Sequence, residues 1–104
     1  MLLTDPGEAD VRFFEERLGA ELVLAETDRV RLELVAAEPR RTGPDDDGTT
    51  AFVVTFHGPP APVLEQGTWT LRGDEIDMPL FVVPTGPTED ARAMCYDAVF
   101  TRLA

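Results

Sequence analysis

The spacing of apolar residues changes once along this 104-residue chain, and the change constrains the fold more than any other feature. Val11, Phe14 and Leu18 follow one another at intervals of three and four residues, which places them on one face of a helix. After Gly19 the apolar residues occupy alternate positions, as they do in strands that bury one face. The sequence therefore predicts one amphipathic helix followed by β structure.

The helix is expected over residues 6–18, because signals for both of its ends are present. Asp5 can act as the N-cap, Pro6 suits the first helical position, and Glu8 stands three residues after the cap, as in a capping box. Gly19 can end the helix in the left-handed conformation.

A β-hairpin is predicted for residues 20–38. Leu22 and Leu24 occupy alternate positions in its first strand, a second alternating run begins at Val30, and Thr27 and Asp28 are expected to form a tight connection. Residues 39–50 contain several turn-forming residues and nothing apolar to bury. We expect a flexible loop there.

Residues 51–103 are expected to form the rest of the β structure. The expected segments are a strand through Phe52, Val54 and Phe56, a strand over Thr68–Arg72 with Trp69 and Leu71 inward, a turn over Gly73–Asp77, a short buried strand over Leu80–Val83, a loop over Pro84–Glu89, at most a helical turn over Asp90–Met94, and a last strand through Tyr96, Ala98 and Phe100. The predicted fold class is α+β: one N-terminal helix followed by about six mainly antiparallel strands in a small barrel or sandwich. We expect residues 1–104 to form a single domain.

The composition removes several kinds of chemistry. The chain contains neither Ser nor Lys, which excludes a serine triad, a Schiff-base amine and a Walker lysine. His57 and Cys95 are the single residues of their types, so the chain cannot supply four N or S ligands to zinc or form an internal disulfide.

A run of carboxylates at Asp45–Asp47 is reminiscent of a calcium loop, but its surroundings do not fit one. Placing Gly48 at the sixth position of an EF-hand loop puts Gly43 at the first and Val54 at the twelfth, where carboxylates are required. We interpret the run as an acidic surface loop. Neither a metal ion nor a cofactor is expected in this protein.

Charge is abundant and unevenly placed. Twenty acidic residues against nine Arg leave a net charge of −11, with −6 over residues 1–28, +2 over residues 29–41 and −7 over the remainder. This balance disfavours direct binding to nucleic acid or to an anionic membrane. One interpretation is a solvated surface that resists aggregation; the alternative is an acidic mimic of nucleic-acid phosphates that inhibits a basic partner.

One catalytic arrangement can be written from the sequence. Cys95 would be the nucleophile, His57 its base and Asp97 the residue that orients the imidazole, because a neighbouring imidazole can activate a thiol. Cys95 and Asp97 share a face of the predicted last strand, but nothing in the sequence brings His57 to them. The alternative is that all three are ordinary strand residues.

The segment between Gly58 and Gly67 is a candidate interaction loop. Its prolines restrict the backbone, two apolar side chains are available for contact, and one carboxamide can bridge backbone groups. The residues concerned are Pro59, Pro60, Pro62, Val63, Leu64 and Gln66. The loop either displays a docking surface or closes the end of a barrel.

Several short motifs occur in a suggestive order: Leu18-Gly19, the segment from Phe52 through Gly58-Pro59 and Gln66-Gly67 to Leu71, Leu80–Pro84, and Tyr96–Phe100. Over residues 13–100 this pattern resembles a family of small bacterial domains of unknown function. The chain departs from that pattern at Thr101, where Asn commonly follows the Phe. The resemblance brings no catalytic residue and implies an accessory role beside phage-tail-like or tail-collar proteins.

These observations favour a non-enzymatic structural or interaction module whose partner is a protein, with a thiol-dependent enzyme and an acidic inhibitor as alternatives. The N-terminal residues lack a basic region followed by a long apolar stretch, so we expect a cytoplasmic protein or a component of an assembly built in the cytoplasm. The oligomeric state stays open. An edge left by incomplete closure of the sheet could pair with another copy or another protein, and the last strand is the candidate for it.

Overall fold

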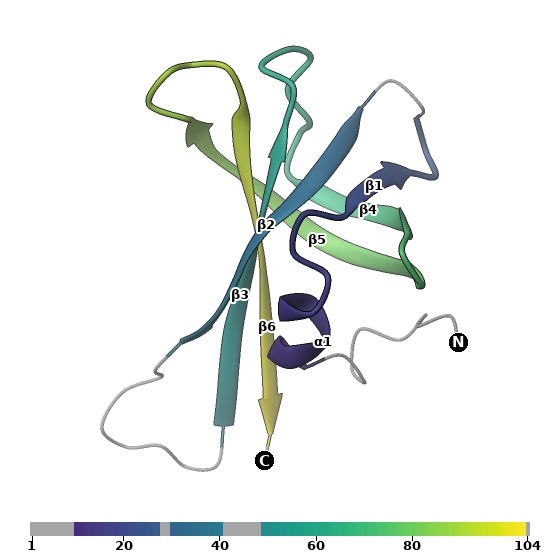
Figure 1. Cartoon of the computed structure of the whole chain (residues 1–104), viewed down its shortest axis with the longest axis vertical. Coiled ribbons are helices and arrows are strands. Elements are labelled where there is room, and N and C mark those ends of the chain that lie inside the picture. Colours follow the sequence, from purple (N-terminus) through teal and green to yellow (C-terminus); the bar gives the residue numbers. More distant parts are fainter. Residues whose placement is uncertain (1–9, 28–29, 41–48, 104) are drawn as a thin grey trace.

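Six antiparallel strands follow one short helix and close into a small β-barrel in the order β1-β2-β3-β6-β5-β4. The computed structural model describes residues 10–27, 30–40 and 49–103 (Figure 1). The elements are α1 (Val11–Glu15), β1 (Glu21–Leu24), β2 (Arg31–Arg40), β3 (Thr49–Gly58), β4 (Gly67–Gly73), β5 (Ile76–Pro87) and β6 (Met94–Leu103). The predicted fold class is confirmed, and the closed barrel decides between the two architectures expected from the sequence.

The helix is shorter than the expected 6–18. Asp10 is extended, with φ −120° and ψ 174°, and its carboxylate accepts a hydrogen bond from the Phe13 N–H at 2.8 Å, so it is the N-cap of α1. The expected cap at Asp5 lies outside the described residues.

Gly19 has the predicted left-handed conformation (φ 92°), and its N–H donates to the Leu34 carbonyl at 2.7 Å. The chain leaves the helix early because it pairs with the edge of β2.

None of the described residues belongs to a helix with the length and apolar character needed to cross a bilayer.

The predicted hairpin is confirmed as β1 and β2, but its connection is longer than a tight turn at Thr27 and Asp28. Beyond β1 the chain continues along β4: the Ala25 N–H donates to the Thr70 carbonyl at 2.9 Å, and the Glu26 carboxylate accepts the Thr70 N–H at 2.9 and 3.2 Å. That backbone hydrogen bond is the main reason why the pKa of Glu26 lies below its ordinary value. Residues 28 and 29 lie outside the described part of the chain.

Two expected loops are partly strand. β2 extends to Arg40 and β3 begins at Thr49, so the predicted loop over residues 39–50 is shorter, and its acidic run lies outside the described residues. β5 covers Ile76–Pro87, so the strand predicted over Leu80–Val83 is present but longer at both ends, and only the last two residues of the loop predicted over Pro84–Glu89 lie outside it. A register shift between Pro84 and Gly86 accommodates the proline that suggested a strand end.

β4 and β5 are joined by two residues rather than the expected five-residue turn. Gly73 pairs with Ile76, and the intervening Asp74 and Glu75 have φ values of 46° and 68°. Positive φ at both central residues is the property of the type I′ turn, whose twist matches that of a β-hairpin.

The core consists of inward side chains from all six strands together with Phe14 of α1. Figure 1 shows β5 and β6 crossing and then diverging, with α1 lying in the opening between them. There the Phe52 and Phe100 rings stack with centroids 4.6 Å apart, and Phe14 packs 5.2 Å from Phe100. α1 therefore covers the core where the two strands separate.

Leu71 is fully buried as predicted, whereas Trp69 is partly buried at the margin of the core.

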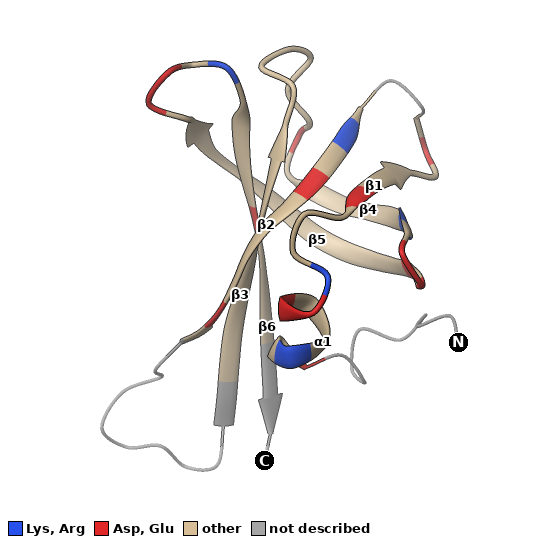
Figure 2. Ribbon diagram, viewed as in Figure 1, with Lys and Arg blue, Asp and Glu red and all other residues tan. Residues whose placement is uncertain are grey.

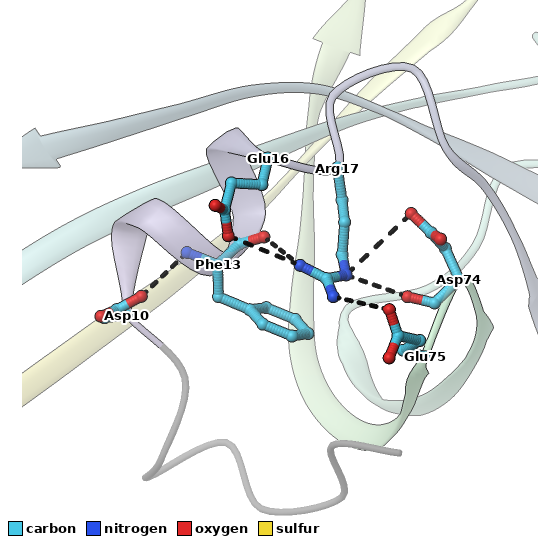
Figure 3. Close-up of polar contacts among 6 residues, drawn as sticks. All are labelled: Asp10, Phe13, Glu16, Arg17, Asp74 and Glu75. Carbon is cyan, nitrogen blue, oxygen red and sulfur yellow. Dashed lines mark hydrogen bonds and ion pairs between the residues drawn. The ribbon is translucent and has the colours of Figure 1, made fainter. Parts of the chain in front are cut away.

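Arg17 fastens the end of α1 to the turn between β4 and β5 (Figure 3). Its guanidinium donates to the carbonyl oxygens of Phe13 and Asp74 and to the Glu75 carboxylate, each at 3.0 Å. It also lies 3.9 Å from the centroid of the Phe13 ring. With 15% of its side chain exposed, Arg17 is shielded enough for these contacts to stabilise the fold more than a fully exposed ion pair would.

The turn between β4 and β5 yields a stability prediction for Gly73→Ala. Gly73 has φ 143°, and a Cβ there would lie 2.9 Å from the backbone oxygen of Glu21, so both strain and a clash oppose the side chain. We expect the free energy of unfolding to fall by about 1–3 kcal/mol. The measurement is urea unfolding followed by Trp69 fluorescence.

Gly67→Ala is the matched control, because a Cβ at Gly67 meets nothing within 4 Å. Its free energy of unfolding should change by no more than about 0.5 kcal/mol, or rise slightly. Equal losses in the two variants would contradict the role assigned to Gly73.

Candidate functional site

The ladder between β3 and β6 places His57 directly opposite Cys95. Residues paired in this way have Cβ atoms about 4.5–5.5 Å apart, so the imidazole and the thiol are neighbours on the outer face of the barrel. Both residues are half-buried. Within the described part of the chain, the side chains of His57 and Cys95 form no hydrogen bond with each other. The structure thus brings together two residues whose proximity the sequence did not reveal.

Asp97 is not placed to orient His57. It lies opposite Thr55, and the Thr55 hydroxyl donates to its carboxylate at 3.0 Å. Relative to His57 it occupies a diagonal position, which in antiparallel sheets corresponds to a separation of about 7–8 Å. The arrangement is therefore a thiol–imidazole pair without its third member. Among the described residues, no group of three His, Cys, Asp or Glu side chains could hold a metal ion.

A second carboxylate, Asp90, lies in the connection between β5 and β6, and no pattern in the sequence indicated it as a site residue. It accepts hydrogen bonds from the Thr88 hydroxyl at 2.6 Å and the Arg92 N–H at 3.1 Å. These bonds, with a smaller electrostatic contribution from His57, hold the pKa of Asp90 below its ordinary value. Asp90 thus organises the connection and is already engaged by donors on both sides.

The loop from Pro59 to Gln66 is attached to the barrel at two points. The buried Tyr96 hydroxyl accepts the Leu64 N–H at 2.9 Å, and the Trp69 indole donates to the Glu65 carbonyl at 3.0 Å. Leu64 is buried and belongs to the core cluster, so this side chain helps to close the barrel instead of facing a partner. Val63 is 47% exposed.

The remaining residues proposed for the loop are at least partly exposed. Pro60, Pro62 and Gln66 are exposed, and Pro59 is half-buried.

An apolar group lies on the outside of three neighbouring strands. We call it the outer stripe, and it consists of Val53 of β3, Val99 of β6, and Phe81 and Val83 of β5. Val53 and Val99 are direct partners, and each residue of the stripe alternates with core residues on its strand. In Figure 2 few charged residues lie on β3, β5 and β6 near the stripe, apart from an acidic position on β6 close to its crossing with β5. Alternation along the strands does not reveal the stripe, because a sheet buried on both faces would show the same apolar runs.

The anchored loop gives a second prediction, for Tyr96→Phe. Removing the hydroxyl leaves the buried Leu64 N–H without its acceptor, which should lower the free energy of unfolding by about 1–3 kcal/mol. Cleavage after Glu65 by a Glu-specific protease should also become faster. Thr55→Val serves as the control, because it removes the half-buried bond to Asp97 without changing the shape of the side chain. A loss in Thr55→Val as large as that in Tyr96→Phe, with no change in cleavage, would refute the anchoring role.

Comparison with curated proteins and with solved structures finds no match to this chain. A family model, by contrast, matches residues 10–100, which include α1, five complete strands and most of β6. The resemblance to a domain of unknown function is thereby confirmed. Since the match extends over most of its length, the chain belongs to the family described as a domain of unknown function, DUF6916.

Proposed function

We propose that this protein is a non-enzymatic interaction module that binds another protein through the outer face of its barrel. The observation that carries the proposal is the outer stripe, in which Phe81 and Val99 are each 53% exposed. An isolated exposed apolar residue has no functional meaning, but here two of them adjoin the half-buried Val53 and Val83. Burying the exposed half of one such side chain contributes on the order of 1 kcal/mol to association.

The setting that we propose, an accessory component of a phage-tail-like assembly, rests on the resemblance of the sequence alone. The net charge of −11 supports a partner with basic groups around its apolar contact. The acidic-mimic alternative also requires a basic partner, but its binding would depend on charge and would weaken strongly with salt.

A test of this proposal is retention of the native partner by the double variant Phe81→Thr with Val99→Thr. Thr keeps the β-branched shape that strands favour while removing apolar surface. We expect the partner captured by the unaltered protein to be lost by this variant at both low and high salt. Val63→Thr, which alters a side chain of similar exposure on the loop, should retain it.

Equal retention by all three proteins would reject the outer stripe as the binding surface. Loss of binding at high salt alone would favour the acidic mimic. Turnover of an ester, thioester or peptide substrate that disappears in Cys95→Ala would reject the non-enzymatic function.

A thiol-dependent enzyme is the second candidate, and the pairing of His57 with Cys95 is the observation that favours it. If the imidazole activates the thiol, alkylation of Cys95 by iodoacetamide should be rapid at neutral pH and should slow in His57→Gln. Under our proposal the two proteins react at the same rate across the pH range. Mass spectrometry of the modified chain measures both rates.

A further inference from the structure

β5 and β6 pair over only part of their lengths. Their last common pair is Val83 with Asp97, after which β6 continues along β3 to Leu103 and β5 follows β4 back to Ile76. Figure 1 shows the two strands diverging beyond their crossing. We call this divergence the split. Considering only the described residues, β6 from Ala98 onward therefore has a neighbouring strand on one side only.

The split is apolar on its outer side. Phe81 and Val99 each lie two residues beyond the Val83–Asp97 pair, so they are the first outward side chains on the two sides of the split. They are also the two most exposed large apolar side chains among the described residues, at 53% each. An unpaired backbone edge and exposed apolar side chains thus occur at the same place.

The two edges of the split differ in their ability to accept another strand. Proteins protect strand edges with proline, bulges or charged side chains. β5 carries Pro79 in its diverging part, and proline cannot donate a backbone hydrogen bond. β6 pairs with β3 in unbroken register from Met94 to Leu103 and contains no proline. The free edge of β6 is therefore the better template for a new strand.

We propose that an extended, basic segment of a partner protein binds in the split, pairing with the edge of β6 from Ala98 onward and placing an apolar side chain between Phe81 and Val99. This inference rests on the proposed function and specifies its surface and its mode. An extended segment is favoured over a helix because it can satisfy the unpaired N–H and C=O groups of β6 while its alternate side chains contact the stripe.

The carboxylates beside the split favour a basic partner. Asp97 lies beside Val99 on the same face, and Glu38 lies opposite Val53, so carboxylates flank the apolar contact. A second copy of this chain would bring the same carboxylates and a net charge of −11. Basic residues flanking an apolar side chain would complement this surface.

The test uses the 104-residue chain and a synthetic peptide that repeats Arg-Thr-Val-Thr, in which Arg and Val occupy every second position and therefore share one face of a strand. A control peptide of the same sequence carries N-methyl groups on alternate residues, which keeps its charge but blocks strand pairing. We expect the unmodified peptide to bind at least about tenfold more tightly, and hydrogen exchange at Ala98–Leu103 to slow when it binds. Equal affinities, or unchanged exchange at these amides, would overturn the proposed mode.

Matched protein variants locate the contact. Val99→Arg places a charge at the split, whereas Val63→Arg makes the same change on the exposed loop. We expect Val99→Arg to weaken peptide binding about tenfold and Val63→Arg to change it less than about twofold. Equal weakening would mean that charge alone attracts the peptide and would refute the inference.

Sedimentation analysis and the native partner separate the remaining outcomes. A dimer that dissociates in Val99→Arg would show that a second copy binds in the split, contrary to the inference. If the native partner is captured through the outer stripe while the Ala98–Leu103 amides stay unprotected, the strand-pairing mode fails and the proposed function stands. If capture does not depend on the stripe, the proposed function fails as well.

Discussion

The packing of Phe14 against the stacked rings of Phe52 and Phe100 is the interaction on which the rest of this barrel depends. The ladders of β1 with β2 and with β4 are short, and β5 and β6 separate where a longer ladder would have sealed the core. Phe14 is fully buried and fills the opening from the inside. The other features of α1 follow from this position, since Asp10 begins the helix and Arg17 fastens its end to the turn between β4 and β5.

Phe14 covers the core where β5 and β6 diverge, but it does not cover the outward side chains there. The helix provides side chains that cover the core, but a helix cannot pair with the backbone edge of a strand. Within the ranges that the structure describes, a buried interior is thereby combined with an edge of β6 that has no pairing partner, beside Phe81 and Val99. The features that we assign to function are consequences of how this barrel closes, and they lie on the face opposite to the core.

The polar side chains on the outer face of β3 and β6 show that strand register determines which side chains become neighbours. His57 and Cys95 are far apart in the sequence and adjacent across two strands, whereas Asp97, close to Cys95 in the sequence, is bonded to Thr55. Alternation along a strand predicts which face a residue occupies, but the pairing partner depends on contacts between distant segments. The thiol–imidazole pair was therefore accessible from the sequence only as a hypothesis, and the failure of the third member to join it was not accessible at all.

Local patterns in the sequence determined the order of the elements, the number of strands and the inward faces of most of them, because helical and strand periods differ and each strand buries one face. They misplaced the start of the helix and the length of β5, since Asp10 and Asp5 offer equal capping chemistry and a proline beside a bulge resembles the end of a strand. Only the tertiary structure decided that the sheet closes, that Leu64 belongs to the core and that β5 and β6 diverge before the end of β6. These outcomes depend on the pairing and packing of residues distant in the chain, which alternation within a single segment does not encode.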